Sequence, residues 1–193
     1  MSAPAQAAEF LLDTLLGLFT LTLLLRFYLQ LVAAPFHNPL SQAVVALTNF
    51  AVRPTRRAIP AWGGLDSASL LLAFVTQLLL QLGTLWLRDF PLLVADGQAY
   101  AAVLGLALLG MIKLSIYIFL YAVLLQAILS WINPYTPLAP TLDSLTQPLL
   151  RPLRRYLPAT GSVDLTPLLV FILAELLLML LVVPLEQQLL RLF

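Results

Sequence analysis

The chain alternates between long apolar stretches and shorter polar segments rich in proline. Four apolar stretches stand out, at residues 10–31, 67–87, 101–132 and 165–183. Each reaches or approaches the ~20 residues that a helix needs to cross a ~30 Å hydrocarbon core. The third is too long for one upright span, so we place its membrane part at 112–132 and leave open whether 101–111 is embedded or interfacial. The pattern predicts an all-α membrane protein of about four transmembrane helices.

The segments between the first and second spans, and between the third and fourth, are interrupted by proline and arginine and cannot cross a membrane. Asn38 and Pro39 are a favourable helix start, since Asn caps helices and Pro is tolerated in the first turn. Apolar residues then recur at helical spacing, at Leu40, Val44, Leu47 and Ala51. This spacing predicts a short amphipathic helix in the membrane interface. We expect it to end near Val52, because Pro54 disfavours helical conformation at Arg53.

An internal repeat organises the chain. A gapless shift of 98 residues aligns 48–71 with 146–169, and 11 of these 24 positions are identical. Both copies contain R-P-x-R-R-x-x-P-A-x-G-x-x-D, a pattern that chance does not readily produce twice. We therefore divide the chain into repeats 1–97 and 98–193, each a helix-loop-helix unit. Because each half holds two spans, both enter the membrane from the same side, which predicts parallel repeats related by a pseudo-two-fold axis along the membrane normal.

Composition narrows the class of protein further. With 61% hydrophobic and 10% charged residues, the chain lacks the polar surface of a water-soluble globule. A net charge of +1 does not indicate a nucleic-acid binder. The absence of cysteine excludes disulfides, thiol catalysis and cysteine-ligated metals. The residues before Phe10 are acidic rather than basic, so we interpret the first stretch as a retained span and not a signal peptide.

Basic residues concentrate in the two repeated turns, as Arg53, Arg56, Arg57, Arg151, Arg154 and Arg155. One interpretation is topological, since basic loops stay in the cytoplasm under the positive-inside rule. A second is that these arginines also bind anionic lipid headgroups or an acidic partner. Nucleic acid is not expected, because no aromatic residues alternate with the arginines as in a stacking platform. Cytoplasmic basic turns would place both chain termini outside the cytoplasmic (inner) membrane.

Two aspartates hold equivalent positions just before the second span of each half. Asp66 and Asp164 can accept hydrogen bonds from the free amides of a first helical turn, so we predict that both are helix caps. Pairing with the arginines upstream is compatible with this role.

Polar residues also occur inside the predicted spans, as Asp13, Arg26, Gln77, Lys113 and Glu175. Such groups are costly in lipid and should face the bundle interior or water. Gln77 and Glu175 share one repeat column, so a polar position is kept at one depth in each half. Two interpretations stay open, helix adhesion through buried polar contacts and an ion or proton pathway. We expect Lys113 and Glu175 to lie close enough to interact.

Candidate catalytic chemistry is sparse. His37 is the only histidine and lies in a loop, so bis-histidine haem ligation and histidine-rich metal sites are not expected. No histidine base accompanies the serines and threonines, and the carboxylates are scattered. We predict no catalytic residue, no metal and no cofactor.

The repeated basic turns, the stretch FHNPLSQAVVALTNF and the segment AILSWINP resemble the YggT family, also called YlmG, of bacterial and plastid membrane proteins. The resemblance covers nearly the whole chain and both repeats. In one departure, the family often has arginine where Gln126 stands, whereas the first half keeps Arg26. The resemblance implies no established enzymatic reaction. It implies links to osmotic or envelope stress and cell division in bacteria, and to maturation of a membrane cytochrome b in plastids.

These observations predict a non-enzymatic accessory or assembly factor of the membrane. It would bind membrane-protein partners or anionic lipid through the basic turns, and the sequence is compatible with a homo-oligomer. The alternative is a channel or transporter component for ions, for which the intramembrane charges and the duplicated halves are the relevant features. Ion flux into proteoliposomes would distinguish the two.

Overall fold

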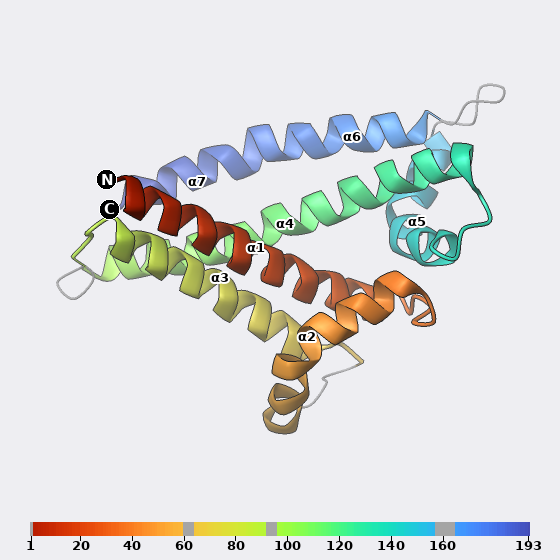
Figure 1. Ribbon diagram of the computed structural model, residues 1–193. Helices are drawn as coiled ribbons and strands as arrows, with labels where there is room; N and C mark the ends of the chain where they lie inside the picture. The colour runs from red at the N-terminus through yellow and green to blue at the C-terminus, as the bar shows by residue number, and fades with distance from the viewer. Residues whose placement is uncertain (1, 60–63, 92–95, 157–164) are drawn as a thin grey trace.

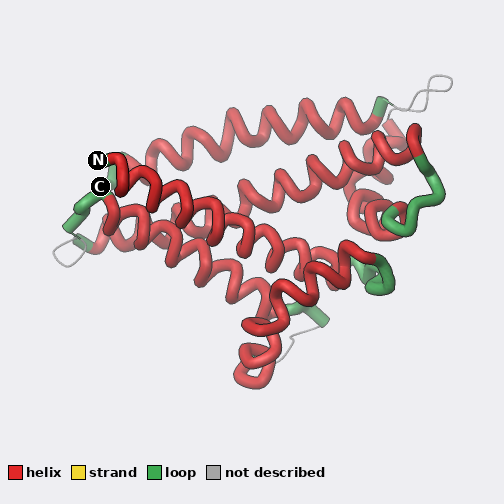
Figure 2. The backbone as a smooth tube through the Cα atoms, in the orientation of Figure 1, coloured by secondary structure: helices red, strands yellow, loops and turns green. Residues whose placement is uncertain are grey.

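The computed structural model describes residues 2–59, 64–91, 96–156 and 165–193, and within them the chain forms helices and loops and no strand (Figures 1 and 2). The helices are α1 (Ala3–Leu31), α2 (Pro39–Ala58), α3 (Ser67–Leu87), α4 (Gly97–Ile132), α5 (Ala139–Tyr156), α6 (Thr166–Leu177), the π-helical segment η2 (Leu178–Val182) and α7 (Val183–Leu190). Four of the described helical stretches are long and apolar enough to cross a membrane, namely α1, α3, α4 and the continuous helix Thr166–Leu190. The prediction of an all-α membrane protein is confirmed.

The helix order repeats as span, short amphipathic helix, span. The shift of 98 residues moves the bounds of α2 to 137–156, close to those of α5. Figure 1 shows the N- and C-termini at one end of the bundle, whereas α2 and α5 lie away from that end. Each amphipathic helix therefore follows the end of a span that is distant from the chain termini.

Helix α2 begins where the sequence predicts but ends later. Asn38 is its N-cap and accepts a hydrogen bond from the Ser41 amide at 2.9 Å, whereas the predicted end near Val52 is wrong. The helix continues through Pro54 to Ala58. Proline removes only one helical hydrogen bond, whose acceptor is the carbonyl of the exposed Phe50, and burial of Val52 holds the helix in place. The predicted basic turn is therefore partly the end of a helix.

The fourth span also extends beyond its predicted end. The sequence predicts 165–183, but the helix continues through η2 and α7 to Leu190. Leu178 and Val182 of η2 are buried, so the π-helical turn packs against the bundle. Pro184 follows directly after η2 within the continuous helix, and the local π-helical geometry there is one way that a membrane helix tolerates the amide hydrogen that proline lacks.

The core lies where α1, α3 and α4 meet. Leu23 and Leu24 of α1 pack there with Ala73 of α3 and with Met111 and Ile118 of α4. A small residue aids this close approach, because a Cβ on Gly110 would collide with the side-chain amide of Gln77.

Packing departs from the predicted two-fold relation between the halves. Helix α3 packs against both α1 and α4, which joins the first half to the second. A two-fold axis would exchange α3 with α6 and α4 with α1, so the contact between α3 and α4 would have an equivalent between α6 and α1. Instead, α6 packs against α4 and α5, and Figure 1 shows it running along α4 at the edge of the bundle. The described part of α6 therefore has an open side.

Candidate functional site

A buried ionic cluster joins α1, α2 and α3 around Asp66. Asp66 is the N-cap residue of α3, and its carboxylate accepts hydrogen bonds from the amide and the hydroxyl of Ser69, at 3.3 and 2.6 Å. Arg56 donates to both carboxylate oxygens, at 2.7 and 3.2 Å, from the last turn of α2. Arg26 of α1 lies 3.8 Å away. With Asp66 only 1% exposed, the cluster fixes how α2 meets the start of α3.

Charge balance explains the state of the Asp66 carboxyl. Burial by itself raises its pKa, but the hydrogen bonds from Arg56 and Ser69 and the positive charge of Arg56 outweigh burial. The pKa of Asp66 therefore lies below its ordinary value, and the residue is a carboxylate at neutral pH. Arg26 is itself buried and donates to the Thr48 hydroxyl at 2.8 Å, so it is held from two sides.

The second half contains a neutral version of part of this cluster. Thr146, which the repeat aligns with Thr48, donates from its hydroxyl to the Gln126 side-chain oxygen at 2.5 Å. Gln126 in turn donates to Asp143 at 3.2 Å. Gln126 thus takes the structural position of Arg26. The N-cap residue of α6 is Leu165, and Asp164, the predicted cap, lies outside the described residues.

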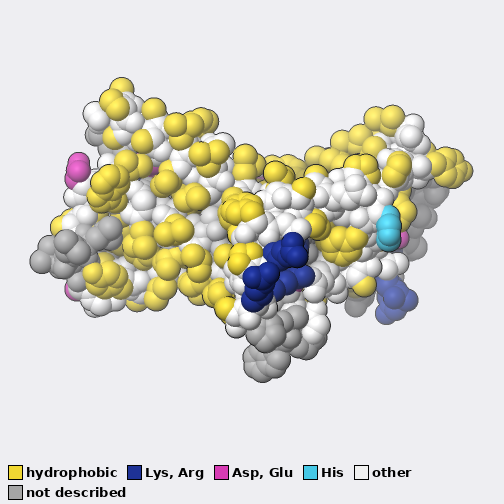
Figure 3. All heavy atoms as spheres, turned by 60° about the horizontal axis from the view of Figure 1, so that its bottom comes forward, with side chains coloured by type: hydrophobic (Ala, Val, Ile, Leu, Met, Phe, Trp, Pro, Cys, Tyr) yellow, Lys and Arg dark blue, Asp and Glu magenta, His cyan; other side chains and the backbone are white. Residues whose placement is uncertain are grey.

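Exposed arginines gather at the ends of the amphipathic helices. Arg53 and Arg57 are exposed at the end of α2, beside exposed Leu47 and Phe50 of the same helix. The end of α5 is similar, with Arg151, Arg154 and Arg155 exposed. Figure 3 shows a compact cluster of basic side chains adjoining a largely apolar surface. Arg56 is also partly exposed, with 40% of its side chain accessible, but its guanidinium binds Asp66.

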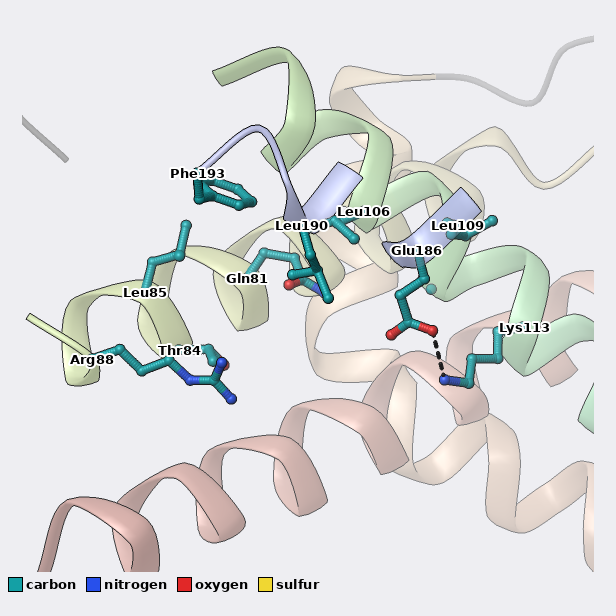
Figure 4. A pocket seen from close by; sticks show the side chains of 11 residues that line it. Gln81, Thr84, Leu85, Arg88, Leu106, Leu109, Lys113, Glu186, Leu190 and Phe193 are labelled. Atoms are coloured by element: carbon teal, nitrogen blue, oxygen red, sulfur yellow. Dashed lines mark hydrogen bonds and ion pairs between the residues drawn. The ribbon is translucent and has the colours of Figure 1, made fainter. Parts of the chain in front are cut away.

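A polar cavity of about 190 Å³ opens between α3, α4 and α7, toward the end that holds the chain termini. Figure 4 shows Glu186 reaching from α7 toward Lys113 of α4, with the Lys113 ammonium 3.2 Å from the carboxylate. Gln81 and Thr84 of α3 line the same space, together with Arg88, the C-cap residue of that helix. Each charged side chain of the Lys113–Glu186 pair is 37% exposed, so the pair is only partly enclosed by the described residues.

The expected interaction between Lys113 and Glu175 is therefore wrong. Lys113 pairs with Glu186, and Glu175 is exposed on α6 with no ion pair to a described residue. Glu186 lies beyond residue 183, the predicted end of the fourth span, in the part of the helix that the apolar pattern does not include. The repeat did carry a signal for Glu186 as a charged position of the fourth span. Glu186 lies 98 residues after Arg88, so both halves have a charged residue in this repeat column.

The other polar residues of the spans divide between two surroundings. Gln77 is buried, with its side-chain oxygen against Gly110. Asp13 lines a groove that continues the cavity along α1 and also contains Lys113 and Glu186. Arg88, which lines the cavity, donates to Glu9 at 2.5 Å, a pair between the ends of α3 and α1 that the sequence pattern does not predict. Among the described residues, no group of three or more His, Asp or Glu side chains converges on a point.

Comparison with known proteins gives a consistent result. The CCB3/YggT family model matches the chain twice, over residues 5–87 and 105–185. An uncharacterized protein of Pseudomonas aeruginosa is 39% identical over 178 residues, which cover 91% of this chain and 88% of the relative. The uncharacterized protein YggT of Escherichia coli is 39% identical over 166 residues, 85% of this chain and 83% of the relative. No solved structure matches. From these matches and its two repeats, the chain belongs to the CCB3/YggT family.

Proposed function

We propose that this protein is a non-enzymatic accessory protein of the bacterial cytoplasmic membrane that binds anionic lipid through the basic ends of α2 and α5. The observation that carries the proposal is the surface of α2, where Arg53 and Arg57 are exposed beside Phe50, which is 73% exposed. An amphipathic helix with this arrangement places its apolar residues among acyl chains and its arginines at lipid phosphates.

The ionic cluster supports this role by positioning the helix. Arg56 is engaged by Asp66 at the start of α3, so the last turn of α2 is attached to the end of a span. That attachment keeps Arg53 and Arg57 near the level where lipid headgroups begin. The positive-inside rule then favours the cytoplasmic leaflet for both basic ends and the opposite side for both termini.

The test compares two variants that each lose two positive charges. Arg53→Gln/Arg57→Gln removes exposed arginines of α2, and Arg88→Gln/Arg191→Gln removes two at the end that holds the termini. Purified protein is exchanged into mixed phosphatidylglycerol and phosphatidylethanolamine micelles, and the bound lipid is measured by mass spectrometry. At about 1 kcal/mol for each arginine near the headgroups, the α2 variant should lose phosphatidylglycerol binding by roughly tenfold or more, and more so in low salt. Equal loss in both variants, or no lipid preference in the unmodified protein, would contradict the proposal.

A channel or transporter component for ions is the second candidate, and the polar cavity of Figure 4 is the feature that favours it. Lys113, Glu186 and Asp13 line connected polar space within the span region. Ion flux into proteoliposomes that Lys113→Ala abolishes would support this candidate over the accessory role.

A further inference from the structure

Glu175 stands at a depth where a carboxylate is difficult to accommodate. It lies nine positions after Thr166, the first residue of α6. At 1.5 Å per residue this is about 14 Å along the helix axis, close to the middle of a ~30 Å hydrocarbon core. A carboxyl group exposed to lipid at that depth costs several kcal/mol, so it needs a protein or water neighbour.

The described part of the chain does not supply that neighbour. The Glu175 side chain is exposed and makes no hydrogen bond or ion pair with a described residue. It does not line the cavity of Figure 4 or the groove that continues it. Two basic residues lie inside the spans, and both have other partners: Lys113 binds Glu186, and Arg26 donates to Thr48 near Asp66. The exposed face around Glu175 is otherwise apolar, with Ile172 one turn before it and Met179 one turn after it.

The repeat shows how an equivalent position is used in the first half. Gln77 occupies the same column as Glu175 but is buried, with only 3% exposed. Its side-chain oxygen lies against Gly110 of α4, so α3 uses this column to meet the other repeat unit. In the second half, α6 packs against α4 and α5, and this column faces outward. The surface that one unit uses to bind its neighbour is thus left open on the other unit.

We infer that a second copy of this chain covers the Glu175 face of α6. A repeat unit already binds another repeat unit within the chain, and the next unit available to α6 is one in a neighbouring copy. Parallel units of two copies can close around a two-fold axis along the membrane normal, which is the commonest symmetry of homo-oligomers. Contact with the second copy removes Glu175 from lipid and gives its carboxyl group a hydrogen-bonding partner.

Two substitutions of Glu175 distinguish the contribution of its polar group to association from the contribution of side-chain size. Glu175→Gln keeps a side chain that donates and accepts hydrogen bonds, so association in the membrane should persist. Glu175→Leu removes the polar group, and association should weaken by about tenfold, the scale of one hydrogen bond between transmembrane helices. Neither change breaks a side-chain hydrogen bond or ion pair to a described residue, because the Glu175 side chain makes none.

The direct test places a photo-crosslinking side chain at Ile172 or Met179 in native membranes that contain two differently tagged copies. The control position is Leu79 of α3, which is exposed to a similar degree in the other half. The expected result is a crosslinked product that carries both tags from Ile172 and Met179 but not from Leu79, with a lower yield in the Glu175→Leu background. A product with a different protein, no product, or an equal yield from Leu79 would each overturn the inference. Lipid binding by α2 is measured on other residues, so the two proposals fail independently.

Discussion

Gln126 holds in the second half the place that Arg26 holds in the first, and each contacts the threonine that the repeat aligns, Thr146 or Thr48. The two halves thus share a helix contact but differ in charge. In the first half, the arginine adds a positive charge near the buried Asp66 carboxylate. In the second, the amide links Thr146 to the exposed Asp143. The duplicated unit keeps its geometry while only one half encloses a buried ionic cluster among the described residues.

Exchanging these two residues should have unequal effects. Arg26→Gln leaves Asp66 with Arg56 as its remaining cation and removes a buried arginine with its hydrogen bonds, so unfolding should become easier by about 1–3 kcal/mol. Gln126→Arg places a guanidinium beside Thr146 and Asp143, where partners are present, and should change stability by less than about 1 kcal/mol. Thermal unfolding in detergent measures both. Equal destabilisation would show that the two positions are not equivalent.

Asp66→Asn tests the charge of the cluster separately from the helix cap. Asparagine caps helices about as well as aspartate, so the substitution keeps the cap and removes the negative charge. Two arginines would then face each other without their carboxylate, and we expect a loss of about 2–4 kcal/mol. Asp96→Asn is the matched control, because Asp96 is an exposed cap that accepts from the Ala99 amide at 2.9 Å. That control should lose under about 0.5 kcal/mol; a similar loss in both would assign the effect to capping alone.

Acid should weaken the protein through the same carboxylate. Because the folded-state pKa of Asp66 lies below its unfolded value, the unfolded chain binds a proton at a pH where the folded protein does not. Its contribution is therefore full above the ordinary aspartate value of about 3.9 and is lost as the pH falls through the folded-state pKa. Melting temperatures of the unmodified protein and Asp66→Asn should differ at pH 7, and the difference should shrink as the pH falls below the ordinary aspartate value of about 3.9. A difference that is unchanged by acid would contradict this.

The orientation of the chain gives a prediction that depends on no side-chain contact. With the basic ends of α2 and α5 in the cytoplasm and four spans, alkaline phosphatase fused after Phe193 should be active in a Gram-negative cell. The same enzyme inserted in the loop after Ala58 should be inactive. Reversed activities would place the basic ends outside.

Sequence predicted the spans and their helical class because lipid imposes one requirement, about 20 apolar residues in a row. It also predicted where α2 begins, since an Asn–Pro pair acts locally. It did not predict where α2 ends, because burial of Val52 and the Arg56–Asp66 pair outweighs the effect of Pro54. The exposure of Glu175 could not be predicted from the sequence either. It depends on how α6 packs against α4, and the repeat favoured the symmetric answer that the structure does not have.

Lys113 pairs with Glu186 and not with Glu175, the partner that the sequence predicts. A double-mutant cycle measures the coupling energy of the observed pair. Lys113 and Glu186 are each 37% exposed, and because partly exposed ion pairs contribute little, we expect a coupling energy of about 0.5–1 kcal/mol. The cycle uses Lys113→Met, Glu186→Gln and the double variant, with unfolding measured in detergent. Lys113→Met combined with Glu175→Gln is the matched control, since Glu175 is a glutamate of the same continuous helix without a contact to Lys113. The first cycle should show coupling and the second should be additive. Coupling of Lys113 to Glu175 instead would contradict the pairing with Glu186. It would mean that the helix Thr166–Leu190 is rotated in detergent so that Glu175 faces Lys113, and that η2 does not hold Glu186 on the cavity wall.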